Sequence, residues 1–228
     1  MSDPIPTTTS GGGGARSQHG WLERRFAVLF YSLLLSIAAL PILNILGFDS
    51  DIIEYFLGLN LLAAAVAIDR GNVRTALLAV VALALIARLG FAWLREQGYG
   101  GVSLAVWSLV ALVAAANALR FALTARAVHS EHVYAVLGAY LLVGLFFGVT
   151  YHVLGQFVPG SFAVGGMPSE EGLSVSNAIY FSFVTIATLG YGDIVPLGDA
   201  ARGLVIIEAV GGQLYIAVLV ARLVNIRA

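Results

Sequence analysis

One short stretch of the chain carries residue types that suit the binding of a dehydrated cation. It reads Thr188-Leu189-Gly190-Tyr191-Gly192-Asp193, with glycine at alternate positions. Glycine readily adopts backbone angles that L-residues avoid, so successive carbonyl groups in this stretch can face the same way. A row of backbone carbonyls can take the place of the water around a cation. The stretch therefore indicates chemistry done by the backbone.

The amino-acid composition indicates whether the protein that contains this stretch is soluble or lies in a membrane. The 228 residues are 59% hydrophobic and 11% charged, with a mean hydropathy of +0.90, whereas an average soluble domain is about 25% charged. A soluble fold cannot bury so much apolar surface, and disorder requires low hydrophobicity. We therefore expect an integral membrane protein. The net charge of −1 gives no reason to expect nucleic acid as a partner, and the absence of cysteine excludes disulfides and thiolate metal sites.

Six runs of the sequence are long and apolar enough to cross a bilayer, which requires roughly 20 such residues. They are residues 26–46, 52–68, 73–94, 102–123, 132–154 and 202–224. The interruption at 155–201 contains a shorter apolar run, 175–187, which would extend over about 20 Å of the ~30 Å hydrocarbon core. We expect an all-α membrane protein with six transmembrane helices and a re-entrant half-helix that leads into residues 188–193. Non-helical backbone at that depth must be buried in protein or line a water-filled cavity.

The arginines predict the orientation, since all 12 basic residues are arginine. With the N-terminus inside, nine of them lie on the cytoplasmic side and three in the outer half, as the positive-inside rule requires. Both termini are then cytoplasmic, and the half-helix enters from outside. The set fits a multi-pass protein of a prokaryotic plasma membrane. The polar residues 1–25 predict a disordered tail.

The stretch 188–193, placed between a half-helix and a last span, resembles the selectivity filter of tetrameric potassium channels. The usual core of that family is Thr-Val-Gly-Tyr-Gly, and here leucine replaces valine. The resemblance is close over residues 132–225. The first four spans resemble the family only in their number and order. The resemblance implies that the carbonyls of Thr188, Leu189, Gly190 and Tyr191 bind K⁺, with the Thr188 hydroxyl as the innermost ring. Gly192 completes the filter.

The resemblance also assigns surroundings to this filter. Asp193 would lie at its outer mouth, and Tyr191 would brace it against Tyr180 and Phe181. One filter strand cannot surround an ion, so the motif implies a homotetramer in a lipid bilayer. The implied activity is passive, selective K⁺ conduction without a cofactor, and the protein is not expected to be an enzyme.

The last predicted span carries further candidate residues. Gly212 lies 19 residues after Asp193, where the family often has a hinge glycine, and Gly211 precedes it. Two adjacent glycines in a helix indicate either bending or close packing. Three residues match positions that face the central cavity in the family: Ile216, Val220 and Val224.

Glu208 is the only carboxylate well inside a predicted span, which makes it a candidate functional residue. We predict a hydrogen bond from Glu208 to the half-helix region that tunes the stability of the filter, with a role in gating. A protonated or paired structural acid without such a role is the alternative.

The first four spans occupy the position of a voltage sensor but lack its arginine repeat. Such a sensor needs three or four gating charges per subunit. The run 102–123 contains a single arginine, Arg120. We therefore predict three parts: a cytoplasmic tail at 1–25, a four-helix membrane domain at 26–128 that does not sense voltage, and a pore domain at 129–228. Because the chain ends four residues after Val224, gating through a cytoplasmic ligand-binding domain is not expected.

Two other functions are compatible with parts of the pattern. Gly190-Tyr191-Gly192-Asp193 matches a signature of intramembrane aspartyl proteases, but those enzymes need a second membrane aspartate. The other aspartates lie in the tail, in loops or at span ends, and none follows a tyrosine. A weakly selective cation channel of the same fold remains the second alternative, since selectivity depends on the rigidity of the filter.

Overall fold

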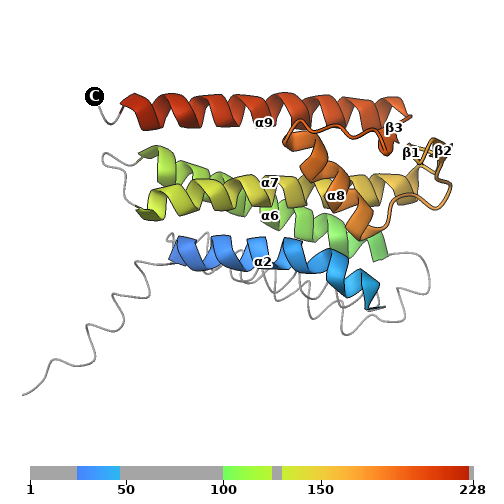
Figure 1. The fold of residues 1–228 in the computed structure, drawn as a ribbon, viewed down its shortest axis with the longest axis horizontal. Helices are drawn as coiled ribbons and strands as arrows, with labels where there is room; N and C mark the ends of the chain where they lie inside the picture. Colours follow the sequence, from blue (N-terminus) through green and yellow to red (C-terminus); the bar gives the residue numbers. More distant parts are fainter. Residues whose placement is uncertain (1–24, 47–99, 125–129, 226–228) are drawn as a thin grey trace, which may run out of the picture.

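The computed structural model describes residues 25–46, 100–124 and 130–225 (Figure 1). Within these ranges the chain is mostly helical. The helices are α2 (Arg25–Ile45), α6 (Gly100–Thr124), α7 (Ser130–Phe157), α8 (Val175–Ile186) and α9 (Asp199–Asn225). Each begins and ends within three residues of a run predicted from the sequence. The predicted tail and the predicted spans 52–68 and 73–94 lie outside the described residues.

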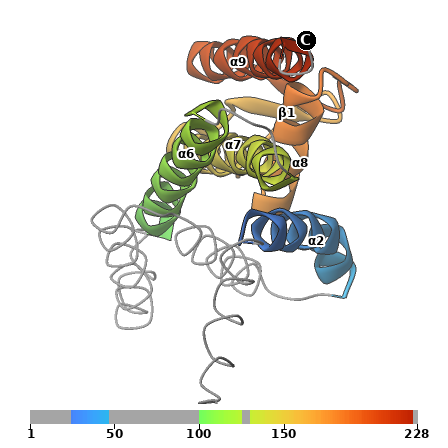
Figure 2. The same ribbon diagram turned by 90° about the vertical axis from the view of Figure 1, so that its left-hand side faces the viewer.

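Helix α7 lies at the centre of this arrangement. Figure 2 shows α9 and α2 on opposite sides of it, with α6 to its left and α8 to its right, and α7 contacts all four. The contact between α6 and α7 is built on small buried side chains, which allow two helix backbones to approach closely. On α6 these are Ala111, Ala114, Ala115, Ala118 and Ala122.

Two helices of the described chain, α7 and α9, are long and apolar enough to cross a membrane, as judged by length and composition. They run in opposite directions, so that α7 ends and α9 begins near the three short strands (Figure 1). The two differ in how well the chain itself covers them. The chain itself buries 61% of the apolar stretch of α7 but only 11% of the apolar stretch of α9.

A small sheet corrects the expectation that the protein is entirely α-helical. Strands β1 (Phe162–Val164), β2 (Met167–Pro168) and β3 (Ile194–Pro196) pair antiparallel in the order β2-β1-β3. With two or three residues each, they are too short to show an alternating pattern in the sequence. The signal that was present is Gly165-Gly166, because two glycines with positive φ make the tight turn of a β-hairpin.

Candidate functional site

The site begins with α8, a helix of 12 residues. Ser174 is the N-cap residue directly before the helix, with a non-helical backbone (φ −58°, ψ 156°). Its side chain accepts a hydrogen bond from the backbone amide of Asn177 at 3.2 Å. Such a cap satisfies one of the amide groups that a helix leaves unpaired at its start. Helix α8 ends at Ile186, directly before the stretch 188–193. Its C-terminal end, which carries the negative end of the helix dipole, therefore adjoins that stretch.

Backbone hydrogen bonds tie the beginning of the stretch to the last turn of α8. The Thr188 amide donates to the Thr185 carbonyl at 2.9 Å, and the Leu189 amide donates to the Val184 carbonyl at 2.9 Å. The Gly190 amide reaches the same Val184 carbonyl at 3.4 Å. Any shift of the end of α8 is thus passed directly to residues 188–190.

The backbone of the stretch alternates in handedness. The φ angles of Thr188, Gly190 and Gly192 are +59°, +55° and +78°, whereas Leu189 and Tyr191 are not in the positive region. Alternating angles of this kind turn successive carbonyls toward one side. The two glycines have the backbone that the sequence predicts. The sequence did not predict a positive φ for Thr188. Such an angle costs a β-branched residue of order 1–3 kcal/mol, so it occurs only where the surrounding structure imposes it.

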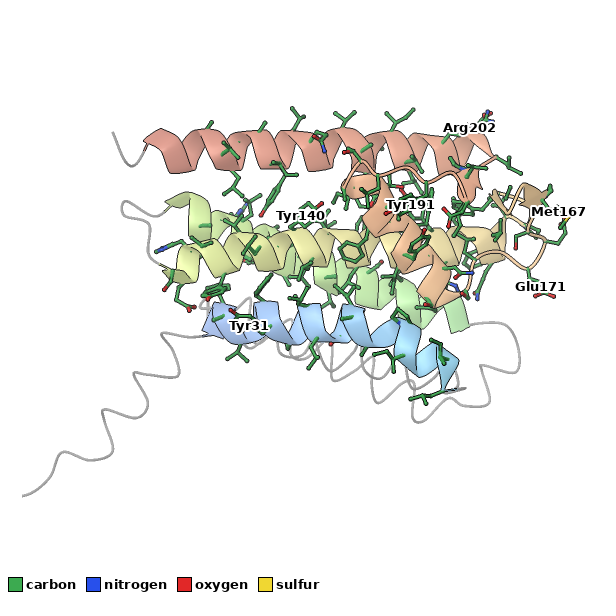
Figure 3. The ribbon with its side chains drawn as sticks, in the orientation of Figure 1. Tyr31, Tyr140, Met167, Glu171, Tyr191 and Arg202 are labelled. Atoms are coloured by element: carbon green, nitrogen blue, oxygen red, sulfur yellow. The ribbon has the colours of Figure 1, made fainter. Side chains whose placement is uncertain are left out.

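The side chains of the stretch are exposed on the single chain, including Tyr191 at 67% (Figure 3). The predicted bracing of Tyr191 by Phe181 is wrong within one chain. Phe181 is buried and packs against Tyr151, with ring centroids 5.1 Å apart, and against Phe162 at 5.8 Å. These contacts fix α8 to α7 and β1. Tyr180 is exposed and interacts with the carboxylate of Asp193.

The small sheet holds the outer end of the stretch. The Gly165 amide, at the tip of the β1–β2 hairpin, donates to the Asp193 carbonyl at 2.8 Å. In the next register position, Val164 of β1 pairs with Ile194 of β3. The stretch is therefore held at both ends by backbone hydrogen bonds of its own chain. Only the Gly165-Gly166 turn could have revealed this second support in the sequence.

Glu208 of α9 is 1% exposed and lies between α7 and α8. The Tyr151 hydroxyl of α7 donates to its Oε2 atom at 2.6 Å, and the Ser182 Oγ atom of α8 lies 2.5 Å from its Oε1 atom. Ser182 Oγ is also 2.7 Å from the Gly144 carbonyl of α7. The predicted hydrogen bond between Glu208 and α8 is present. Tyr151 and Ser182 had no signal in the sequence, because they lie 57 and 26 residues from Glu208.

The two adjacent glycines of α9 have different surroundings. A Cβ atom on Gly212 would lie 2.6 Å from Ile186 Cγ1 and 3.3 Å from the Ile186 carbonyl oxygen, at the end of α8. A Cβ atom on Gly211 would meet nothing within 4 Å. Helix α9 continues through both positions. The geometry favours close packing as the reason for Gly212, and bending at this point stays a prediction.

The predicted cavity-lining residues lie four positions apart on α9. Ile216 and Val220 are exposed on the single chain, and the side chain of Val224 lies outside the described part. Exposure by itself does not distinguish these residues, since several other apolar residues of α9 are equally uncovered. These are Ile206, Ile207, Val210, Leu214 and Val218.

Two long antiparallel helices thus accompany a short helix and a loop of alternating handedness (Figure 1). The family model described as "Ion channel" matches residues 136–227, which contain most of α7 and the whole of α8, the alternating stretch and α9. Over this region the chain is similar to ion channels, and the curated proteins that it resembles are potassium channels.

Two curated potassium channels are similar to part of this chain. The chain is 34% identical over 87 residues to the inward rectifier potassium channel Kirbac3.1 of Paramagnetospirillum magnetotacticum, covering 36% of this chain and 25% of that protein. It is 40% identical over 63 residues to the two pore potassium channel c of Oryza sativa subsp. japonica, covering 28% of this chain and 12% of that protein. The match thus spans a quarter or less of either relative. No solved structure matches.

Proposed function

We propose that this protein is a potassium-selective channel that conducts K⁺ passively through a pore shared by four copies. One observation carries the proposal. Residues 188–193 combine the filter order of residue types with left-handed backbone at positions 188, 190 and 192. A backbone that alternates in this way presents its carbonyls to one axis, as ion coordination requires.

The ion sites follow from this backbone. The carbonyls of Thr188, Leu189, Gly190 and Tyr191 would coordinate K⁺, with the Thr188 hydroxyl as the innermost ring and Asp193 at the outer mouth. The exposure of these residues on the single chain supports a filter that faces a shared space. The C-terminal end of α8 would direct its partial negative charge toward a cation below the filter.

The tetramer is proposed because one strand cannot surround an ion. The poor cover of α9 within its own chain supports it, since an apolar helix left open by its own chain can pack against copies of itself or face a central cavity. In that arrangement Ile216, Val220 and Val224 would line the cavity below the filter, and Glu208, Gly211 and Gly212 would influence gating.

The membrane arrangement is also a proposal. Residues 26–128 would form a four-helix domain and residues 129–228 the pore domain, with six spans, α8 re-entrant from outside and both termini in the cytoplasm. In a plasma membrane the strands β1–β3 would then face outward. The absence of an arginine repeat in 102–123 favours gating by a stimulus other than voltage.

A planar-bilayer recording of the purified protein, with K⁺ on one side and Na⁺ on the other, tests the function. We expect the current to reverse near the K⁺ equilibrium potential. Gly190→Ala should abolish selective K⁺ current, because alanine at φ +55° costs about 1–2 kcal/mol and distorts the carbonyl row. Gly203→Ala is the matched control, since Gly203 lies in α9 outside the filter with open space around it. A reversal potential that ignores the K⁺ gradient would instead favour a weakly selective cation channel.

A further inference from the structure

The carboxyl group of Glu208 joins three helices at a point behind the filter. Its two oxygens contact Tyr151 of α7 and Ser182 of α8, and all three side chains are fully buried. Ser182 is two residues before Val184, whose carbonyl holds the Leu189 and Gly190 amides. The cluster is thus attached to the part of α8 from which the filter begins.

The number of hydrogens in this cluster is informative. A serine hydroxyl has one hydrogen, and a backbone carbonyl can only accept. Ser182 Oγ lies within hydrogen-bond distance of both the Gly144 carbonyl and Glu208 Oε1. If Glu208 were ionised, both neighbours would be acceptors, and one hydrogen could satisfy only one of them well.

A proton on Glu208 Oε1 resolves this conflict. Oε1–H then donates to Ser182 Oγ, the Ser182 hydroxyl donates to the Gly144 carbonyl, and the Tyr151 hydroxyl donates to Oε2. Each of the three oxygen–oxygen contacts then has one hydrogen, and each donor has one acceptor.

The charges around Glu208 agree with a neutral acid. The titratable groups that act on it are Tyr151 and Tyr140, both on α7, while α8 presents the uncharged Ser182. Within the described part of the chain, neither an arginine nor a histidine is among its partners. A carboxylate buried without a cationic partner is costly, whereas a neutral acid with satisfied hydrogen bonds is not.

We propose that Glu208 is a neutral carboxylic acid that donates a hydrogen bond to Ser182, and that Tyr151 and Ser182 are positioning residues that hold α8, and through it the filter, against α7 and α9. The effect on the filter rests on the proposed function, whereas the protonation of Glu208 does not. The network would support the filter from behind, on the side opposite to the hydrogen bond between Gly165 and Asp193.

Infrared spectroscopy of the purified full chain at neutral pH tests the protonation. We expect a carbonyl stretching band of a protonated carboxylic acid that is lost in Glu208→Gln. The band should shift in Ser182→Ala, which removes the acceptor of the acid proton, and in Tyr151→Phe, which removes the donor to Oε2. Lack of the band in the unaltered protein, or its persistence in Glu208→Gln, would overturn the proposal.

Bilayer recordings test the positioning role. Ser182→Ala and Tyr151→Phe should make K⁺ current decline faster during continuous recording, because α8 is held less firmly. Ser176→Ala and Tyr134→Phe are the matched controls, since each removes one hydroxyl from the same helix, and Tyr134 interacts with Tyr31 rather than with Glu208. Equal decline in all four variants would contradict the positioning role. Absence of K⁺ current in the unaltered protein would contradict the proposed function, and the infrared result would still decide the protonation.

The thermal midpoint of unfolding adds a readout that is independent of current. Glutamine can donate to Ser182 and accept from Tyr151, as a neutral acid does. Glu208→Gln should therefore lower the midpoint less than Glu208→Leu, which has neither group. Equal losses in both variants would contradict a donating Glu208.

Discussion

Gly212 is the residue at which the backbone of α9 packs tightly against Ile186 at the end of α8. The helix interior disfavours glycine by about 1 kcal/mol relative to alanine, so two adjacent glycines need a reason. At position 212 the reason is steric, because Ile186 occupies the space that a side chain would need. At position 211 no neighbour within the described chain supplies such a reason.

This difference predicts opposite outcomes for two similar substitutions. Gly212→Ala should destabilise the protein by roughly 1–3 kcal/mol, as overpacking in a tight contact does. Gly211→Ala should be neutral or stabilising, because alanine favours the helix. The thermal midpoint of the purified protein in detergent measures both.

A control tests the stated cause. Gly212→Ala should cost less in an Ile186→Ala background than in the unaltered chain, because Ile186→Ala removes the side-chain atoms that the new methyl group would meet. Ile186→Ala alone is measured as well, since the loss of a buried side chain is itself destabilising. If Gly212→Ala were as stable as Gly211→Ala, the close packing inferred for position 212 would be wrong.

At the scale of elements, an aromatic cluster connects the small sheet to the helices. Phe162 of β1 is fully buried, and its ring lies 5.7 Å from that of Tyr151 on α7 and 5.8 Å from that of Phe181 on α8. Because β1 pairs with β3, this cluster also anchors the segment that follows residues 188–193. The sheet thus supports one end of that stretch and is itself held by a buried side chain.

Phe162→Ala should cost about 3–5 kcal/mol, as the loss of a buried phenylalanine does. Met167→Ala, in the paired strand β2, should change stability by less than about 0.5 kcal/mol, because Met167 is exposed. Figure 3 shows Met167 at the end of the molecule where α9 begins. Thermal unfolding compares the two, and similar losses would show that the sheet is not anchored through Phe162.

At the scale of the whole molecule, α9 forms one side of the single chain with little of its apolar surface covered (Figures 1 and 2). In a bilayer such a face contacts lipid rather than water, so its contact with a neighbouring copy is stabilised by van der Waals packing. In the proposed assembly, four copies meet around the filter and α9 lines the pore or contacts a neighbouring copy.

Native mass spectrometry from detergent tests this assembly. We expect a species of four times the chain mass of 23.9 kDa, and a species of one chain after denaturation. A stable species of one or two chains under native conditions would contradict the tetramer, because a filter of one or two strands leaves an ion incompletely surrounded.

Much of the pore region was predictable from local patterns. The bounds of α7, α8 and α9 follow from the length of apolar runs, and the angles of Gly190 and Gly192 follow from residue type. The strands were missed because two or three residues carry too little pattern. The angle of Thr188 was missed because hydrogen bonds to Thr185 and its neighbours impose it against the preference of the residue.

By itself, the sequence determined where the described helices and the stretch 188–193 lie along the chain and which family residues 132–225 resemble. These are local properties, set by hydropathy over about 20 residues and by the spacing of two glycines. Only the tertiary structure decided which contacts surround the stretch 188–193 and the end of α8: the hydroxyls around Glu208, the side chain that Gly212 accommodates, and the amide of Gly165 that donates to the Asp193 carbonyl. These contacts join residues 26 or more positions apart, so they exist only once α7, α8 and α9 have packed together.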